Sequence, residues 1–147
     1  MRFFLCAFES MYVGIPVDTV DSLMVYGKEA GALILRDKSS ADIYFSLPLF
    51  FGARREALRH GIILKGSAGA DGRHVLLVPV VEREEDIPEE EIHTMPGILA
   101  DIGRVSFISG IRFTDSAMTL FIDPAKFINN ILSENPDALQ GTHKGKE

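Results

Sequence analysis

Short apolar runs separated by polar or glycine-containing segments set the pattern of this chain. The clearest pair lies within residues 32–52, ALILRDKSSADIYFSLPLFFG. Its apolar residues predict one strand over 32–35 and another over 43–47, with a charged exit that begins at Arg36 and a polar turn between them. Two such runs predict an antiparallel hairpin, followed by a helical turn that ends at Gly52. An arginine is rarely buried without a partner, so Arg36 is expected to face water or a partner molecule.

The same pattern continues along the chain and predicts about nine short strands with little helix, which is typical of an all-β, barrel-type fold. Residues 53–60, ARREALRH, predict a short exposed helix or a loose loop. Pro79 lies within an apolar run and therefore predicts an edge strand or a bulge there. The remaining strands are predicted over 2–8, 11–15, 21–26, 62–65, 74–81, 105–113 and 118–122, with a helical turn over 17–20 and a loop over 27–31.

The C-terminal part predicts a hairpin and one helix. Alternating residues of the first strand are expected to share a face, and the chain turns at 114–116. Asp123 followed by Pro124 is a helix start, because an acidic N-cap precedes proline at the first helical position. From Ser133 the chain is polar and is expected to fray. The alternating residues are Val105, Phe107, Ser109, Ile111 and Phe113.

Composition and charge narrow the class of protein. The 147 residues are 46% hydrophobic, which fits a single globular domain. The net charge is −6, and acidic residues concentrate over 82–91. This makes nucleic acid a poor partner, since a phosphate backbone needs clustered Lys and Arg. No apolar run approaches the roughly 20 residues of a membrane span. A soluble, cytoplasmic protein without membrane insertion is therefore expected.

No catalytic, metal-binding or cofactor-binding residue is predicted. Cys6, the only cysteine, lies in an apolar run, where a buried packing role is expected. The glycine-rich stretch 66–72 leads into a strand rather than a helix, which favours a hairpin connection over a phosphate cradle. The four histidines do not pair at the spacing of metal ligands, although two of them, His60 and His74, could meet across a hairpin. The acidic run 82–91 is interpreted as an exposed crossover.

The pattern of residues alone therefore predicts a non-enzymatic binding module. One alternative is a small-molecule-binding or cyclic-dinucleotide-binding β-barrel that uses Arg54, Arg55 and Arg59 as an anion site. Their R-x-x-x-R spacing is found in cyclic-dinucleotide receptors, but the D-x-S-x-x-G partner motif of those receptors does not follow it.

The order of several motifs resembles the CheW-like domain family, the coupling module of bacterial chemotaxis arrays. The N-terminal half carries F-L-C-A-F, then Y-V-G-I-P-V-D-T-V, then A-L-I-L-R, and then a strand ending S-L-x-x-x-F-G. The C-terminal half carries Met95-Pro96 and the ending T-L-F-I-D-P-A-K-F-I, which is similar to the closing motif of that family. The resemblance spans residues 3–132, so a CheW-like domain is expected over 1–133 and a polar tail over 134–147.

The resemblance implies a mainly β fold of two interlocked five-stranded barrels around a shared core, with short helical turns and a short C-terminal helix. It implies an adaptor that couples the cytoplasmic tips of methyl-accepting chemoreceptors to the regulatory domain of the histidine kinase CheA. Three partner-binding residues follow from it. Arg36 falls on the arginine of the family's R-G motif, and Val20 and Ser22 fall on the edge that faces the kinase.

The chain departs from the family at positions that belong to the contact surfaces implied by the resemblance. Asp37 replaces the glycine of the R-G motif, and Ser22 and Ser46 stand where acidic residues are common. An adaptor with a different protein partner is therefore an alternative. Arg36 also has a simpler interpretation, as a turn residue that faces water.

Overall fold

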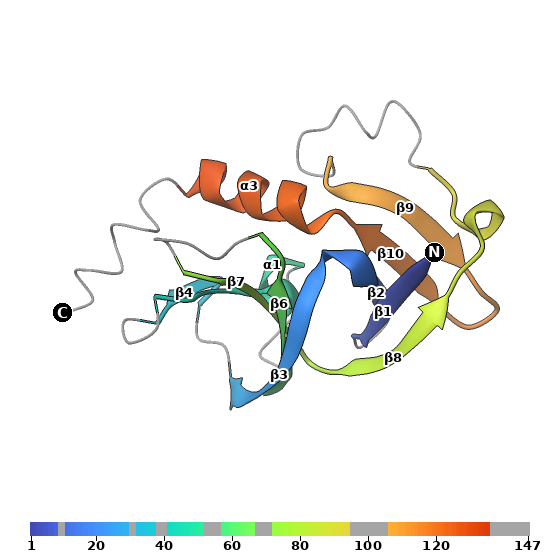
Figure 1. The fold of residues 1–147 in the computed structure, drawn as a ribbon. Helices are drawn as coiled ribbons and strands as arrows, with labels where there is room; N and C mark the ends of the chain where they lie inside the picture. Colours follow the sequence, from blue (N-terminus) through green and yellow to red (C-terminus); the bar gives the residue numbers. More distant parts are fainter. Residues whose placement is uncertain are drawn as a thin grey trace. The chain divides into compact units, whose positions relative to one another are not determined.

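The chain folds into two compact units, each built on one five-stranded sheet. A computed structural model describes residues 1–8, 11–29, 32–37, 41–51, 57–66, 72–94 and 106–135. The first unit comprises Met1–Thr19 and Val80–Asn130, and the second comprises Val20–Pro79 and Ile131–Glu147. Within the described ranges, no helix combines the length and the apolar character needed to cross a membrane. The chain thus has the mainly β architecture predicted from its sequence, with short helices between the strands (Figure 1).

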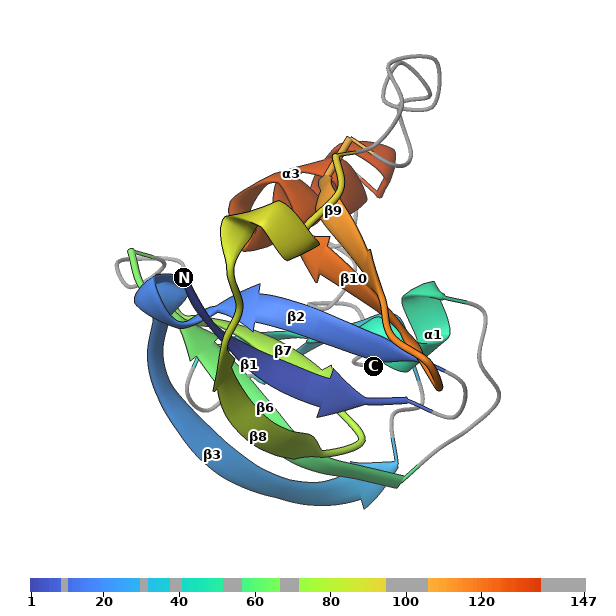
Figure 2. The same ribbon diagram turned by 90° about the vertical axis from the view of Figure 1, so that its right-hand side faces the viewer.

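The sheet of the first unit has the strand order β8-β1-β2-β10-β9. Its neighbours are antiparallel except for β2 and β10, which run parallel. Figure 2 shows β8, β1 and β2 side by side along this sheet. The bounds are β1 Arg2–Ala7, β2 Tyr12–Pro16, β8 Val81–Asp86, β9 Ile108–Phe113 and β10 Met118–Ile122, with the short 3₁₀ helices η1 Val17–Thr19 and η2 Glu89–Glu91.

The sheet of the second unit has the order β3-β6-β7-β5-β4 and repeats the same pairing pattern. Its third and fourth strands, β7 and β5, run parallel, and the other neighbours are antiparallel. Each sheet therefore consists of three antiparallel strands and an antiparallel pair, and one parallel contact joins the two groups. The bounds are β3 Val20–Glu29, β4 Ile34–Arg36, β5 Ile43–Ser46, β6 Ala57–Leu64 and β7 His74–Val78, with the helix α1 Leu47–Phe50.

Each sheet curls so that strands far apart in its order approach one another. In the second unit the rings of Tyr26 on β3 and Tyr44 on β5 lie 5.6 Å apart, although two strands separate them. In the first unit Arg112 on β9 reaches Glu85 on β8, and these strands are the two edges of the sheet. The two five-stranded sheets therefore have the curvature of small barrels, as the resemblance predicted.

Each unit buries its own group of apolar side chains. In the first unit Phe3 packs against Phe121, with ring centroids 4.6 Å apart. Phe107 and Phe127 form a second, edge-to-face pair. These aromatic contacts supply much of the apolar area that stabilises small β-units. The cluster of the first unit contains Phe3, Leu5, Ile87 and Phe121, and that of the second contains Tyr44, Leu58, Ile63, Val75 and Leu77.

Each of the helices α3 (Pro124–Glu134) and α1 begins at a residue whose side chain caps the backbone N–H groups of its first turn. In α3, the carboxylate of Asp123 accepts a hydrogen bond from the backbone N–H of Lys126 at 3.2 Å. The predicted N-cap is therefore confirmed. In α1, the Ser46 hydroxyl accepts from the backbone N–H of Leu49 at 3.4 Å. Fraying was predicted from Ser133, but α3 continues to Glu134, so the prediction is wrong there; residues 136–147 lie outside the described residues.

Two predictions about the middle of the chain are wrong. Residues 57–60 belong to strand β6, where a helix or loop was expected, because they pair with the second half of β3. The strand predicted over 74–81 ends at Val78, so Pro79 follows β7 and interrupts no ladder. Consequently β7 is an inner strand between β6 and β5, not an edge. The glycine-rich stretch does connect the antiparallel pair β6 and β7, as predicted.

Three further elements differ from the sequence pattern. The predicted loop over 27–31 is wrong in its first part, because β3 continues through a bulge to Glu29. The acidic run begins with strand β8, which pairs with β1, so it is not a crossover. Another bulge shifts the register of β9 against β10, because Phe121 pairs with Gly110 and the next residue pairs with Ile108. The predicted alternation over 105–113 is therefore broken at Ser109.

Candidate functional site

Arg36 is the last residue of β4, an edge strand of the second sheet. Its backbone pairs with Ile43 at the start of β5, so the predicted hairpin is confirmed. The Arg36 side chain is half-buried. Directly after it, the backbone N–H of Asp37 donates to the carbonyl of Asp42 at 2.8 Å. Arg36 therefore stands at the open end of the hairpin, where the chain turns.

The buried carboxylate of Asp42, directly before β5, forms an ion pair with Arg73. The Asp42 side chain is only 4% exposed, and its carboxylate accepts from Arg73 Nη2 at 2.8 Å and from Arg73 Nε at 3.2 Å. The backbone N–H of Arg73 donates to the same carboxylate at 3.2 Å. Beside this pair, the backbone N–H of Ile43 donates to the carbonyl of Arg73 at 2.8 Å. A hydrogen-bonded carboxylate of this kind holds Asp42 and Arg73 in a fixed position at the start of β5 and β7.

Two tyrosines lie close to the same turn. Burial raises the pKa of Tyr44, and the charges of Asp42 and Asp37 raise it further. Burial also raises the pKa of Tyr26, again with a contribution from Asp37. Both phenols therefore stay protonated at neutral pH. They are hydrogen-bond donors in this region and are not available as bases.

Val20 and Ser22, the other two predicted partner-binding residues, lie at the start of β3. Val20 is 7% exposed and is part of the buried core, whereas Ser22 is exposed. The Ser22 hydroxyl donates to the carboxylate of Asp21 at 3.4 Å. The strand β3 forms one edge of the second sheet and β4 forms the other. The sheet order thus separates Arg36 from Val20 and Ser22 by three intervening strands.

The edge strand β3 also exposes apolar side chains that the sequence analysis did not single out. Val25 is 80% exposed and Leu23 is 43% exposed. Their backbones pair with His60 and Ile62 of β6 on one side only, so the other side of the strand is the sheet edge. The alternation in 21–26, DSLMVY, is the signal that could have found them, since Met24 and Tyr26 pack against the core on the opposite face.

The four sheet edges differ in how they are protected against further strand pairing. The edge strand β8 carries a continuous series of charged residues from Glu82 to Asp86. The edge strand β9 forms an extra bridge with His93, and β4 is only three residues long. By contrast, β3 spans ten residues, and no charge interrupts its stretch 22–26. This makes β3 the sheet edge best suited to a protein contact.

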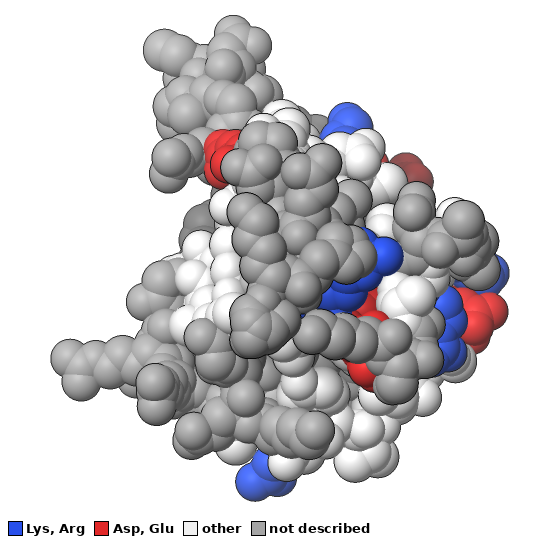
Figure 3. All heavy atoms as spheres, turned by 90° about the vertical axis from the view of Figure 1, so that its left-hand side faces the viewer, with Lys and Arg blue, Asp and Glu red and all other residues white. Residues whose placement is uncertain are grey.

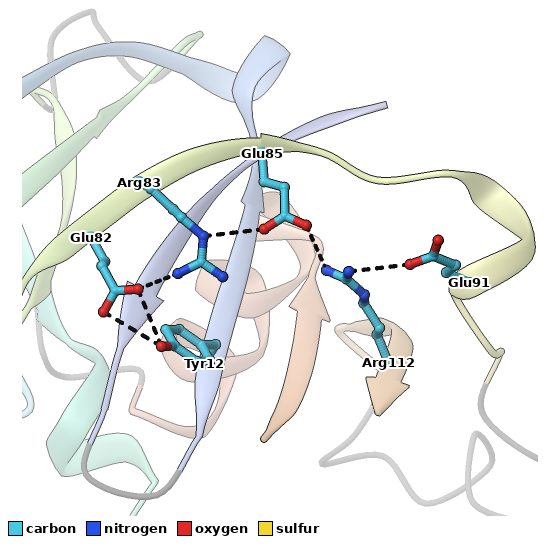
Figure 4. Close-up of polar contacts among 6 residues, drawn as sticks. All are labelled: Tyr12, Glu82, Arg83, Glu85, Glu91 and Arg112. Atoms are coloured by element: carbon cyan, nitrogen blue, oxygen red, sulfur yellow. Dashed lines mark hydrogen bonds and ion pairs between the residues drawn. The ribbon is translucent and has the colours of Figure 1, made fainter. Parts of the chain in front are cut away.

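The charged residues of β8 form a network across the first sheet (Figure 4). Arg83 hydrogen-bonds Glu85 at 3.1 Å and also pairs with Glu82. The Tyr12 hydroxyl donates to Glu82 at 3.1 Å. Arg112 of β9 bonds Glu85 at 3.0 Å and Glu91 at 3.1 Å. The acidic run is therefore largely paired with arginine, and its role in the first unit is structural.

The described residues hold no cluster of three metal-ligating side chains. Burial raises the pKa of the Cys6 thiol to about 12, so this cysteine is not a nucleophile at neutral pH. The prediction that His60 and His74 could meet across the hairpin is wrong, because His60 pairs with Val78. In the proposed anion site, Arg59 is exposed on β6, and Arg54 and Arg55 lie outside the described residues.

Surface charge is mixed on the face drawn in Figure 3. Lys and Arg side chains of described residues lie next to Asp and Glu side chains there, and they do not gather into one basic field. This distribution agrees with the net charge of −6. The described residues drawn in Figure 3 therefore form no continuous basic surface of the kind that binds nucleic acid.

Comparison with known proteins identifies the fold. No known protein family has a sequence profile that matches this chain, and no curated protein matches it in sequence. The structure is similar to that of the scaffolding protein TtCheW from Thermoanaerobacter tengcongensis, with a TM-score of 0.59 and 17% sequence identity. The match covers 83% of this chain and 83% of that chain. The chain therefore has a CheW-like fold, in agreement with the resemblance seen in its sequence.

Proposed function

We propose that this chain is a non-enzymatic adaptor of chemotaxis signalling, which couples chemoreceptor tips to the regulatory domain of the histidine kinase CheA. The observation that carries the proposal is the exposed edge strand β3, where Val25 and Leu23 face outward on a fold similar to that of a CheW scaffold protein. Aromatic and aliphatic side chains that are exposed at a sheet edge are typical of protein-binding surfaces.

The proposal assigns separate contacts to the two edges of the second sheet. The edge strand β3, with Val20 and Ser22 at its start, faces the kinase. The half-buried Arg36 at the end of β4 is a charged anchor for a second contact. These residues lie on two different strands, β3 and β4, so the proposal gives each partner its own strand. The adaptor domain comprises residues 1–133, residues 134–147 form a tail, and the protein acts in the cytoplasm.

The proposal does not require a catalytic group. The only cysteine is buried, and the acidic residues of β8 are paired with arginines or, for Asp86, with the N-terminal ammonium group. A cyclic-dinucleotide receptor is the competing function, and a thermal-shift screen distinguishes the two. A ligand that binds the folded state raises the melting temperature by mass action. Cyclic dinucleotides are expected to leave the melting temperature unchanged, and a concentration-dependent rise would favour the receptor.

Arg36→Glu is expected to weaken partner binding at least tenfold, because it places a negative charge where the proposal needs a cation; loss of a charge-assisted contact costs about 1.5–3 kcal/mol. The melting temperature should change little, since the side chain is half-buried at the end of a short strand. Binding is measured by titration with the CheA regulatory domain and with a receptor-tip fragment. A large fall in melting temperature would show that Arg36 is structural instead.

Val25→Lys is expected to abolish binding to the CheA regulatory domain, because it places a charge in the centre of the apolar edge. Stability should change by no more than about 0.5 kcal/mol, since the side chain is 80% exposed. The matched control is Phe113→Lys, which alters an exposed apolar residue of the other sheet. If both variants bind as the parent does, β3 is not the kinase contact.

A further inference from the structure

The first sheet is closed across its two edges by side chains and one bridge rather than by a ladder. Its edge strands are β8 and β9, which are not paired with each other. Arg112 of β9 spans the opening and bonds Glu85 of β8 at 3.0 Å and Glu91 of η2 at 3.1 Å (Figure 4). Nearby, His93 and Ile111 exchange two backbone hydrogen bonds of 2.8 Å. Closure on this side therefore depends on one arginine and a short backbone contact.

The position of Arg112 suits it to hold the edge strands β8 and β9 together. Its side chain is only 16% exposed, and each of its two terminal nitrogens has its own carboxylate. In the pairing of β8 with β1, Glu85 lies opposite Phe3, so the two side chains point to the same face of the sheet. That face is the one on which Phe3 packs against Phe121. The ion pairs therefore lie at the rim of the apolar interior of the first unit.

The strand β8 contributes no buried side chain to the first unit. None of its residues from Val81 to Asp86 is buried, and it pairs with β1 through a register shift between Leu5 and Cys6. Segments with few buried apolar contacts open locally at lower free energy than the core. The buried Ile87 directly after β8 is the next apolar anchor. A detached β8 would thus expose the Phe3–Phe121 interior without unfolding the rest of the sheet.

We propose that Arg112 is a latch that holds β8 and β9 together, and that protonation of Glu85 releases it. Five groups face the Glu85 carboxylate or its partners: Arg83, Arg112, Glu91, Glu82 and Tyr12. Burial alone would raise the pKa of Glu85, but hydrogen bonds and charges from Arg112 and Arg83 outweigh it and lower the pKa.

The sign of the pH effect follows from this lowered pKa. A carboxylate whose pKa is lower in the closed state stabilises that state at every pH above its ordinary value. The stabilisation is lost as the pH falls through the lowered pKa of Glu85. The latch is therefore closed at neutral pH and released in acid. Added salt weakens it too, since all members of the network are partly exposed and their charges are screened.

The test is hydrogen exchange of the backbone amides of β8, measured on the whole chain. Glu85→Gln is expected to raise their exchange about tenfold at about pH 7, which corresponds to the loss of one charge-assisted hydrogen bond. Glu84→Gln is the matched control, because Glu84 lies on the same strand and pairs with Arg2 outside the network. It should change exchange less than about twofold.

Two further readouts separate the latch from a general loss of stability. Amides of β6 and β7 in the second sheet should exchange at the parental rate in Glu85→Gln, and a rise there would show global unfolding and overturn the latch. Between about pH 7 and about pH 3, a range that extends below the ordinary pKa of a glutamate, the parent should lose protection in β8 beyond the intrinsic effect of pH, while Glu85→Gln should not. Equal pH responses of the parent and Glu85→Gln would also overturn the proposal.

Discussion

Replacing Gly72 with alanine is expected to lower the free energy of unfolding by about 3–5 kcal/mol. Gly72 has a φ of +79°, a conformation that costs an L-residue about 1–2 kcal/mol. In addition, a methyl group there would come within 1.9 Å of the backbone carbonyl oxygen of Ala41. Because the obstacle is backbone, the turn after Arg36 would have to move. The change is measured by urea unfolding followed by circular dichroism.

Gly66→Ala is the matched control for this substitution. Gly66 has nearly the same φ, +74°, but no atom lies within 4 Å of the added methyl group. It should therefore show the conformational cost alone, about 1–2 kcal/mol. If the two variants lose the same free energy within about 0.5 kcal/mol, then the close approach of Gly72 to Ala41 does not define the turn.

Asp42→Ala is expected to lower the free energy of unfolding by about 2–3 kcal/mol. The substitution removes a buried carboxylate that accepts three hydrogen bonds from Arg73, one of them from its backbone N–H. The cost stays below that of a fully buried pair, because the Arg73 side chain is 45% exposed and can return to water. Urea unfolding measures the loss.

Asp115→Ala provides the comparison, since Asp115 is an exposed residue of the β9–β10 hairpin. It should change stability by less than about 0.5 kcal/mol. If Asp42→Ala has an equally small effect, the Asp42–Arg73 pair contributes no net stability. The same variant should also weaken binding through Arg36, because the turn beside Arg36 would lose its fixed geometry.

The local elements of the fold were predictable where sequence pattern and environment agree. The hairpin of β4 and β5, the cap of α3 at Asp123 and the hairpin of β9 and β10 rest on neighbouring residues, and the structure confirms all three. Elements that depend on distant partners were misread. Residues 57–60 are polar, yet they form a strand because β3 lies beside them.

The same reason explains what the sequence analysis missed at the candidate site. Parallel pairs such as β2–β10 join segments about a hundred residues apart in the chain, and no local pattern reports them. The contact of Asp42 with Arg73 follows from the parallel pairing of β5 with β7, and that of Arg112 with Glu85 follows from the curvature of the first sheet. The alternation over 21–26 could have indicated that Val25 is exposed, but the position of β3 at an edge of the sheet could not be read from it. The order of the motifs predicted the CheW-like fold, whereas the exposed edge of β3 became apparent only from the strand order of the sheet.

The departures from the CheW-like pattern bear directly on the choice of partner. Asp37 follows Arg36 and is part of the turn that Asp42 and Arg73 stabilise. An acidic residue at this position changes the charge presented beside the arginine. The charge of Asp37 also reaches β3, where, in addition to burial, it raises the pKa of Tyr26. The exposed side chains Leu23 and Val25 lie on the opposite face of β3 from Tyr26, so kinase binding through them is expected to be retained even if the contact at Arg36 has a new specificity.

The most direct test is a calorimetric titration of the whole chain with the CheA regulatory domain from the organism that encodes it. The proposed adaptor function predicts a one-to-one complex with a dissociation constant of about 1–10 μM or tighter, which Val25→Lys abolishes and Phe113→Lys preserves. A folded protein that shows no binding, in the titration and in a second method such as co-sedimentation, would contradict the proposed coupling to CheA.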